Sequence, residues 1–333
     1  MTFIKMAAAP CTQAASMNIL QADIAPGPGV RPGSAQAWSA ATRPRSLAVA
    51  VSPVLVGATL GFVRTGAIDW RAALLVLGAA LLTQLVTNLQ NDVGYTLRGG
   101  ERGGGQGVAR TGLPRATAQG WLGVNQVRVA IVVAALLATV LGLLLVAHRG
   151  WPVLAIGVAS LTAALAYMGG ARPIAYTALG ELTVFVFFGL VAVMGTDWVL
   201  TGSVGAVTLL AALAIGGLAA AALAVNNHRD IAHDRAVGRR TFAVSFGERA
   251  SRRLYTGLLW APFALLPFMA WAAAAPAFLL PLLVAPAAWR LRQDFVASAG
   301  GLALNVVLFR TFKLELWFAA LLSAGALASK MWG

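Results

Sequence analysis

Blocks of apolar residues follow one another along most of this chain, with short polar stretches between them. Each block is about twenty residues long, enough for a helix to cross the ~30 Å hydrocarbon core of a bilayer. The pattern predicts nine such helices, at residues 46–63, 72–91, 125–147, 152–168, 178–196, 203–226, 255–274, 276–290 and 312–329. The eighth is short and rich in proline, a residue that interrupts helices. We therefore predict an all-α, polytopic membrane protein with nine transmembrane helices in a single bundle.

The composition agrees with this pattern. Of the 333 residues, 59% are hydrophobic and only 11% are charged, whereas soluble globular proteins carry about 25% charged residues. This excludes a soluble fold and a disordered chain. It also excludes an outer-membrane barrel, because barrel strands are short and alternate polar with apolar residues.

The distribution of positive charge predicts the orientation. The chain has 25 Lys and Arg against 11 Asp and Glu, a net charge of +14. With a cytoplasmic N-terminus, all of these cations lie inside except Arg64, Arg71, Arg149 and Lys330. The positive-inside rule accounts for such a bias, so we expect an N-in, C-out protein and no nucleic-acid partner.

Residues 1–38 are predicted to form a disordered tail, and residues 39–333 to form the transmembrane domain. The tail contains a stretch of Pro, Gly and small residues that cannot bury enough apolar surface to fold. The single cysteine, Cys11, lies there, which excludes an intramolecular disulfide and a cysteine metal cluster.

Two long connections, 92–124 and 227–254, fall on the same predicted side of the membrane. The helix before each ends in a related motif, NLQND at 88–92 and NNHRD at 226–230. In both motifs Asn and Asp are four residues apart, which places them on one helix face. A basic segment follows each motif, at 110–115 and at 238–241. We expect the two connections to form one site on the cytoplasmic face.

The residue types in these motifs predict the ligand. Carboxylate and amide oxygens suit Mg²⁺, which binds substrate phosphates while keeping several waters. Arginines bind phosphate oxygens bidentately, and an apolar bundle interior can hold a long hydrocarbon tail. His228 and His233 flank the second motif, but Mg²⁺ prefers oxygen ligands. The site is predicted to bind a lipid diphosphate with Mg²⁺.

Four segments resemble the UbiA superfamily of intramembrane prenyltransferases. They are ATRPRSL at 41–47, NDVGYTLRG at 91–99, AYTALGELTVFVFFG at 175–189 and NNHRDIAHDRAVGRRTFAV at 226–244. The resemblance extends from residue 39 to about residue 329. Within the superfamily, the chain is most similar to the 1,4-dihydroxy-2-naphthoate polyprenyltransferases of menaquinone synthesis.

The resemblance implies a reaction and a set of site residues. A polyprenyl group would pass from its diphosphate to an aromatic quinone precursor, with loss of CO₂ on the naphthoate branch, in a bacterial cytoplasmic membrane with the site facing the cytoplasm. The resemblance implies no obligate protein partner. Asp92, Asp230 and Asp234 are the implied catalytic residues and, with Asn91, the ligands of Mg²⁺. The implied substrate-binding residues are Asn88, Arg110, Arg115, Asn226, Arg239 and Arg240, with Arg172 and Tyr176, close to Glu181, for the acceptor.

One residue departs from the resembled motif, which usually reads N-D-x-x-D. The second acid is replaced by Tyr95, and a neutral phenol does not replace a carboxylate on Mg²⁺. Either Asn91 and Asp92 suffice, or Glu101 contributes, or the substrate or activity has changed; Tyr95 could instead stack on the acceptor ring. The alternative functions are prenylation of 4-hydroxybenzoate, homogentisate or haem, and transport of an anionic lipid.

Overall fold

The computed structural model describes residues 29–100, 111–298 and 301–332. Every regular element in these ranges is a helix. The N-terminal half contains α2 (Ala35–Thr42), η1 (Pro44–Leu47), α3 (Ala48–Thr65), α4 (Trp70–Leu97), α5 (Val124–Arg149), α6 (Trp151–Met168) and η3 (Ile174–Tyr176). The C-terminal half contains α7 (Gly180–Val184), η4 (Phe185–Met194), α8 (Gly195–Thr201), α9 (Ala206–Arg229), α10 (Ile231–Ala236), α11 (Phe242–Ala272), η5 (Pro276–Val284), α12 (Ala285–Ala297) and α13 (Ala303–Trp332).

The prediction of an all-helical, multi-pass membrane protein is confirmed for these residues. Seven helical segments in the described ranges are long and apolar enough to cross a membrane, and they correspond to the first seven predicted spans. The eighth predicted span falls on η5 and the start of α12, a segment interrupted by Pro276, Pro281 and Pro286. The ninth lies within α13. The total of nine spans stays a prediction.

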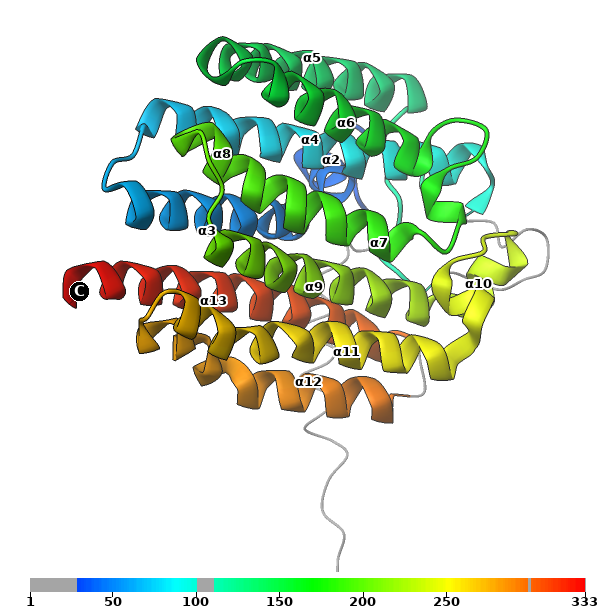
Figure 1. Cartoon of the computed structure of the whole chain (residues 1–333). Coiled ribbons are helices and arrows are strands. Elements are labelled where there is room, and N and C mark those ends of the chain that lie inside the picture. Colours follow the sequence, from blue (N-terminus) through cyan, green and yellow to red (C-terminus); the bar gives the residue numbers. More distant parts are fainter. Residues whose placement is uncertain (1–28, 101–110, 299–300, 333) are drawn as a thin grey trace, which may run out of the picture.

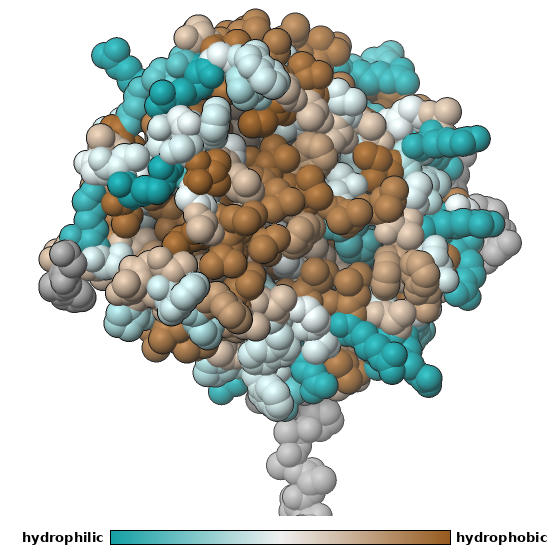
Figure 2. All heavy atoms as spheres, in the orientation of Figure 1, coloured by the Kyte–Doolittle hydropathy of each residue, from teal (hydrophilic) through white to brown (hydrophobic). Residues whose placement is uncertain are grey.

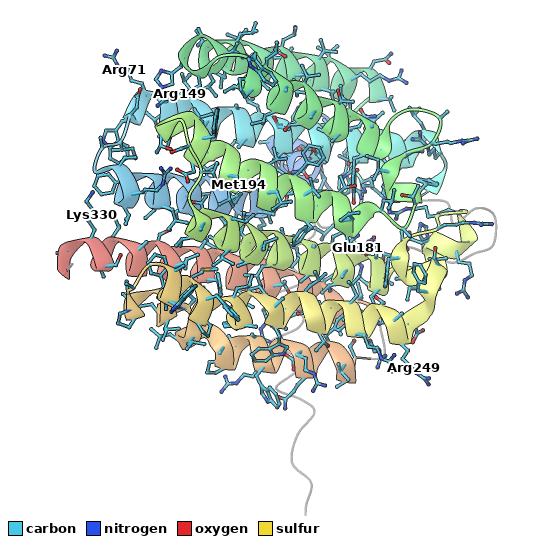
Figure 3. All side chains as sticks on the ribbon, in the orientation of Figure 1. Arg71, Arg149, Glu181, Met194, Arg249 and Lys330 are labelled. Carbon is cyan, nitrogen blue, oxygen red and sulfur yellow. The ribbon has the colours of Figure 1, made fainter. Side chains whose placement is uncertain are left out.

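The long helices lie side by side as a bundle, with α5 and α6 at one edge and α11 and α12 at the other (Figure 1). Apolar side chains gather over the middle of the bundle, and hydrophilic ones lie toward both ends of the helices (Figure 2). Arg71, Arg149 and Lys330 lie at one end of the bundle, and Arg249 at the other (Figure 3). This arrangement suits a molecule whose middle is in hydrocarbon and whose ends are in water.

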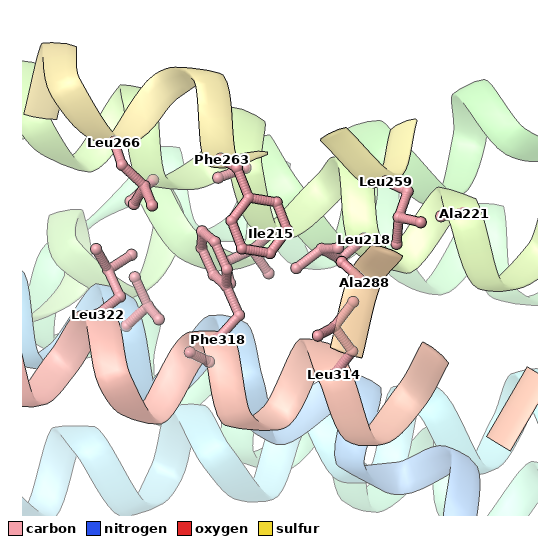
Figure 4. Close-up of a cluster of buried hydrophobic side chains, with 14 of the residues drawn as sticks. Ile215, Leu218, Ala221, Leu259, Phe263, Leu266, Ala288, Leu314, Phe318 and Leu322 are labelled. Atoms are coloured by element: carbon pink, nitrogen blue, oxygen red, sulfur yellow. The ribbon is translucent and has the colours of Figure 1, made fainter. Parts of the chain in front are cut away.

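Helix α9 is the centre of the bundle and is buried along most of its length. Ile215 and Leu218 of α9 pack with Leu259 and Phe263 of α11 and with Phe318 of α13 in the main core (Figure 4). Much of the rest of α9 is alanine and glycine. Such small residues let helix backbones approach closely in a membrane.

The fifth span is continuous from α7 through η4 to α8, and η4 is a ten-residue π-helix. Gly189 of η4 packs directly on Gly216 of α9. A Cβ atom at residue 189 would lie 2.5 Å from the carbonyl oxygen of Ala212. Because π-helices are rare and occur mostly at functional sites, η4 is a candidate wall of a site.

The predicted boundary between tail and domain, at residue 38, falls inside α2. Val30 and Ala37 are buried in a cluster with Val86 and Leu89 of α4. Residues 1–28 of the predicted tail lie outside the described residues. The limits of the two parts therefore stay a prediction.

Candidate active site

A cavity of about 840 Å³ lies between α3, α4, α6, η4 and α9. Most of its wall is apolar, for example Leu161 of α6, Phe187 and Phe188 of η4, and Val54 of α3. Its charged lining in the described part of the chain consists of four arginines, Arg43, Arg45, Arg115 and Arg239, with no Asp or Glu.

All four arginines of the lining, together with several amides and one tyrosine, lie near helix ends on one side of the bundle. We call this set the polar end of the cavity; it consists of Arg43, Arg45, Asn88, Asn91, Tyr95, Arg115, Asn226 and Arg239. The C-terminal turns of α4 supply Asn88 and Asn91, and the last turn of α9 supplies Asn226. Arg43 lies between α2 and η1, just before the first span. The structure thus brings the two predicted motifs together on one site.

The first predicted acid, Asp92, is fully buried and faces the segment that carries Arg115. One carboxylate oxygen accepts hydrogen bonds from the backbone N–H of Thr117 at 2.8 Å and from its hydroxyl at 2.5 Å. The other accepts one from the backbone N–H of Ala116 at 2.9 Å. Asp92 therefore fixes residues 115–117 against α4, which places Arg115 on the cavity.

The second predicted acid, Asp230, is buried beside Arg229. The guanidinium donates to both carboxylate oxygens, from Nε at 2.9 Å and from Nη2 at 2.6 Å. It also donates to Asn226 and to Asn305 of α13, and Thr111 donates to Asp230 at 3.3 Å. This network joins the end of α9 to α13 and to the segment after residue 110.

The third predicted acid, Asp234 of α10, pairs with Arg239 at 2.6 Å. Arg239 also donates to the carbonyl oxygen of Ala175 and to the hydroxyl of Tyr95. Burial raises the pKa of Asp234, and the Arg239 guanidinium opposes that shift. The second oxygen, Oδ2, is buried and has no hydrogen-bond partner among the described residues.

The amide and carboxylate oxygens at the polar end are of the type that binds Mg²⁺. Asn91 and Asn226 line the cavity, and Asp234 Oδ2 is a buried acceptor. Hard oxygen ligands of this kind are the ones that Mg²⁺ takes. Across the described ranges, however, no three His, Cys, Asp or Glu side chains gather in one group that could hold a metal ion.

The other predicted site residues lie in different places. Asn88 donates to the carbonyl oxygen of Thr42 and to the hydroxyl of Ser46, so it holds the start of the first span against α4. Arg172 and Arg240 are exposed and do not line the cavity. Tyr176 also lies outside the lining, with its ring 5.6 Å from the Arg239 guanidinium. Arg110 and Glu101 lie outside the described residues.

The sequence motifs alone did not assign Arg43, Arg45 and Tyr167 to the site. Arg43 and Arg45 belong to the TRPRS segment that opens the first span, and both line the cavity; the density of cations in this segment was the available signal. Tyr167 lines the cavity from α6, at the end of an otherwise apolar block. No sequence pattern around Tyr167 marked it as a residue of the site.

The comparisons with known proteins agree with this geometry. Residues 50–309 match the UbiA prenyltransferase family, so the chain belongs to that family and is a prenyltransferase. It is 36% identical to a 1,4-dihydroxy-2-naphthoate octaprenyltransferase of Mycobacterium tuberculosis, over 87% of this chain and 96% of that protein. It is 35% identical to the Escherichia coli protein of the same name, over 67% of this chain and 73% of that protein. The predicted membership of the naphthoate branch is thereby confirmed.

The fold is also found in a solved structure, that of a UbiA homolog from Archaeoglobus fulgidus bound to DMAPP and Mg²⁺. The TM-score is 0.63 at 15% sequence identity, and the match covers 88% of this chain and 99% of that one. At this identity the likeness establishes the fold alone.

Proposed function

We propose that the chain transfers a polyprenyl group from polyprenyl diphosphate to 1,4-dihydroxy-2-naphthoate. The observation that carries this proposal is the cavity, whose wall is apolar and whose charged lining, among the described residues, is arginine alone. An apolar wall suits a hydrocarbon chain, and arginines suit a diphosphate. The relatives named 1,4-dihydroxy-2-naphthoate octaprenyltransferase support this choice of acceptor.

In this proposal the diphosphate binds at the polar end, with Arg115 and Arg239 as its nearest fixed cations. The prenyl chain extends along Leu161, Phe187 and Phe188 toward the opposite end of the bundle. Asp92 acts on the substrate through Arg115, because its hydrogen bonds hold residues 116 and 117 in place.

The predicted ligands Asn91, Asp92, Asp230 and Asp234 would hold magnesium through oxygen atoms, and the metal would supply Lewis-acid neutralisation of the diphosphate. The three carboxylates would have to draw together around the ion, because among the described residues they do not form one group. Among these ligand atoms, Asp234 Oδ2 is buried and has no hydrogen-bond partner in the described chain. Asp92 and Asp230 already accept hydrogen bonds from Thr117 and Arg229. These contacts hold the Asp92 carboxylate against the segment that carries Arg115 and the Asp230 carboxylate beside Arg229.

The chemistry breaks the C–O bond of the allylic diphosphate, and the diphosphate leaves with the bonding electrons. The apolar wall excludes water from the allylic cation. The electron-rich naphthoate ring then forms the new C–C bond at the carbon that loses its carboxylate as CO₂. Arg172 and Tyr176 remain our candidates for contact with the acceptor, which would enter beside Arg239.

We further propose nine spans, an N-in, C-out orientation and a polar end that faces the cytoplasm in a bacterial inner membrane. The charge distribution supports this, because Arg71, Arg149 and Lys330 cluster at the end of the bundle away from Arg249 (Figure 3). Transport of an anionic lipid is set aside as the main function, because the chain belongs to a family of prenyltransferases.

The test is product analysis by mass spectrometry. Purified protein receives one polyprenyl diphosphate and equal amounts of 1,4-dihydroxy-2-naphthoate, 4-hydroxybenzoate and homogentisate. We expect the prenylated, decarboxylated 1,4-dihydroxynaphthalene, which is the reduced form of a naphthoquinone, as the main product, and only when Mg²⁺ is present. A prenylated 4-hydroxybenzoate or homogentisate as the main product would assign the chain another acceptor.

A further inference from the structure

Tyr95 lies at the polar end of the cavity, at the position where the resembled motif carries an acid. Its side chain is buried, with 3% of its surface exposed, and it lines the cavity. The last turns of α4 bring it one helical turn beyond Asn91. It therefore belongs to the polar lining rather than to the lipid-facing surface.

Two arginines that also line the cavity lie against the ring of Tyr95. The guanidinium carbon of Arg115 is 4.4 Å from the ring centroid, and that of Arg239 is 5.1 Å from it. Arg239 Nη1 donates to the Tyr95 hydroxyl. Both arginines are 3% exposed, so their positions are set by packing. Tyr95 thus contacts both arginines through the face of its ring.

A neutral ring and a carboxylate would act differently here. An aromatic ring attracts a cation through its quadrupole and leaves the cation's charge in place. A carboxylate at the same distance would neutralise one of the two guanidinium groups in a medium of low dielectric constant. With tyrosine at residue 95, both guanidinium groups keep their charge beside the ring on the cavity wall, and Arg239 is paired with Asp234.

We propose that Tyr95 is a positioning residue that holds Arg115 and Arg239 as an anion-binding pair, and that this pair captures the substrate diphosphate without a metal ion. This rests on the proposed function and deepens it, because it separates binding of the diphosphate from turnover, for which the metal is still needed. The chain thus binds its prenyl diphosphate by arginine, where a carboxylate at residue 95 would require a bridging cation.

The test measures binding rather than activity. The full-length protein in detergent is titrated calorimetrically with geranyl thiodiphosphate, whose bridging sulfur resists cleavage, first in EDTA and then in Mg²⁺. The variants are Tyr95→Phe, which keeps the ring, and Tyr95→Asp, which introduces the carboxylate. Arg71→Gln serves as the charge control, because Arg71 is exposed at the far end of the bundle. Thermal unfolding of each variant checks that it is folded.

We expect wild type, Arg71→Gln and Tyr95→Phe to bind in EDTA within a few-fold of one another. Tyr95→Asp should bind about 10- to 100-fold more weakly in EDTA, which corresponds to one lost charge-assisted contact, and should recover in Mg²⁺. Binding of wild type in Mg²⁺ but not in EDTA would overturn this inference and leave the proposed function intact. Equal binding of Tyr95→Asp and wild type in EDTA would overturn the role of Tyr95. Absence of binding in both conditions would contradict the proposed function itself.

Discussion

The carboxylate of Asp92 accepts two hydrogen bonds from Thr117, one from its backbone N–H at 2.8 Å and one from its hydroxyl at 2.5 Å. This contact joins the end of α4 to a segment 25 residues further along the chain. The same segment carries Arg115 into the cavity. The first motif therefore organises the polar end through the backbone as well as through the chemistry of its acid.

The hydrogen bonds of Asp92 predict that the protein loses stability when one of the two acceptor oxygens is removed. Asp92→Asn replaces one carboxylate oxygen by an NH₂ group, which cannot accept a hydrogen bond from the backbone N–H of Ala116 or Thr117. A buried group left without its hydrogen bond costs about 1–3 kcal/mol. We expect a lower Tm in detergent. The control is Asp69→Asn at the other end of the same helix, where Asp69 caps α4 and asparagine caps equally well. Equal Tm values for the two variants would contradict the structural role of Asp92.

Asp230 is predicted to be necessary for turnover. Asp230→Asn removes a buried carboxylate that faces Arg229 and that we propose as a ligand of Mg²⁺, so less metal charge is held in place to neutralise the departing diphosphate. We expect the rate of diphosphate release at saturating substrate to fall about 10²- to 10³-fold. Asp294→Asn, which breaks the exposed pair with Arg310, should leave the rate unchanged. Full activity of Asp230→Asn would remove Asp230 from the site.

The close approach of η4 to α9 predicts opposite effects for two glycine substitutions. Gly189→Ala places a Cβ 2.5 Å from the carbonyl oxygen of Ala212, and overpacking of this kind costs about 1–3 kcal/mol. Gly257→Ala in α11 meets no atom within 4 Å and should stabilise its helix by up to about 1 kcal/mol. Thermal unfolding checks both. A Gly189→Ala protein as stable as wild type would show that η4 can move away from α9.

The orientation of the chain predicts the side of each reporter fusion. Alkaline phosphatase, which works outside the cytoplasm, should be active when fused to the C-terminus, and green fluorescent protein in the same place should be dark. A fusion truncated at Gly120, in the second of the predicted cytoplasmic segments, should give the reverse pattern. Fluorescence of the C-terminal fusion would place the C-terminus in the cytoplasm and contradict the predicted orientation.

The sequence predicted the helices because long apolar blocks leave few alternatives in a membrane. The sequence also predicted that Asn88, Asn91 and Asn226 lie at the same end of the bundle. An even number of membrane crossings separates the two motifs, so both must lie on the same side. The sequence could not predict the contacts between distant segments. The pairing of Arg229 with Asn305 joins residues 76 apart, and no local pattern encodes it.

Of two further features, the sequence indicated the first through its prolines and did not indicate the second. The eighth predicted span is divided between η5 and α12, because its prolines remove backbone donors along the segment. Arg43 adopts a left-handed backbone conformation, with φ of 54°, between α2 and η1. That turn separates α2 from the first span, and its arginine lines the cavity.

The central claim is that the cavity holds the prenyl chain with its diphosphate at the polar end. A farnesyl diphosphate analogue with a diazirine on its tail tests this directly, by photolysis in membranes and peptide mapping of the adducts. We predict adducts on η4 and α6, at residues such as Phe187, Phe188 and Leu161, that an excess of unlabelled farnesyl diphosphate suppresses. Adducts confined to the lipid-facing surface of α5, for example at Val133 and Leu137, would contradict the claim.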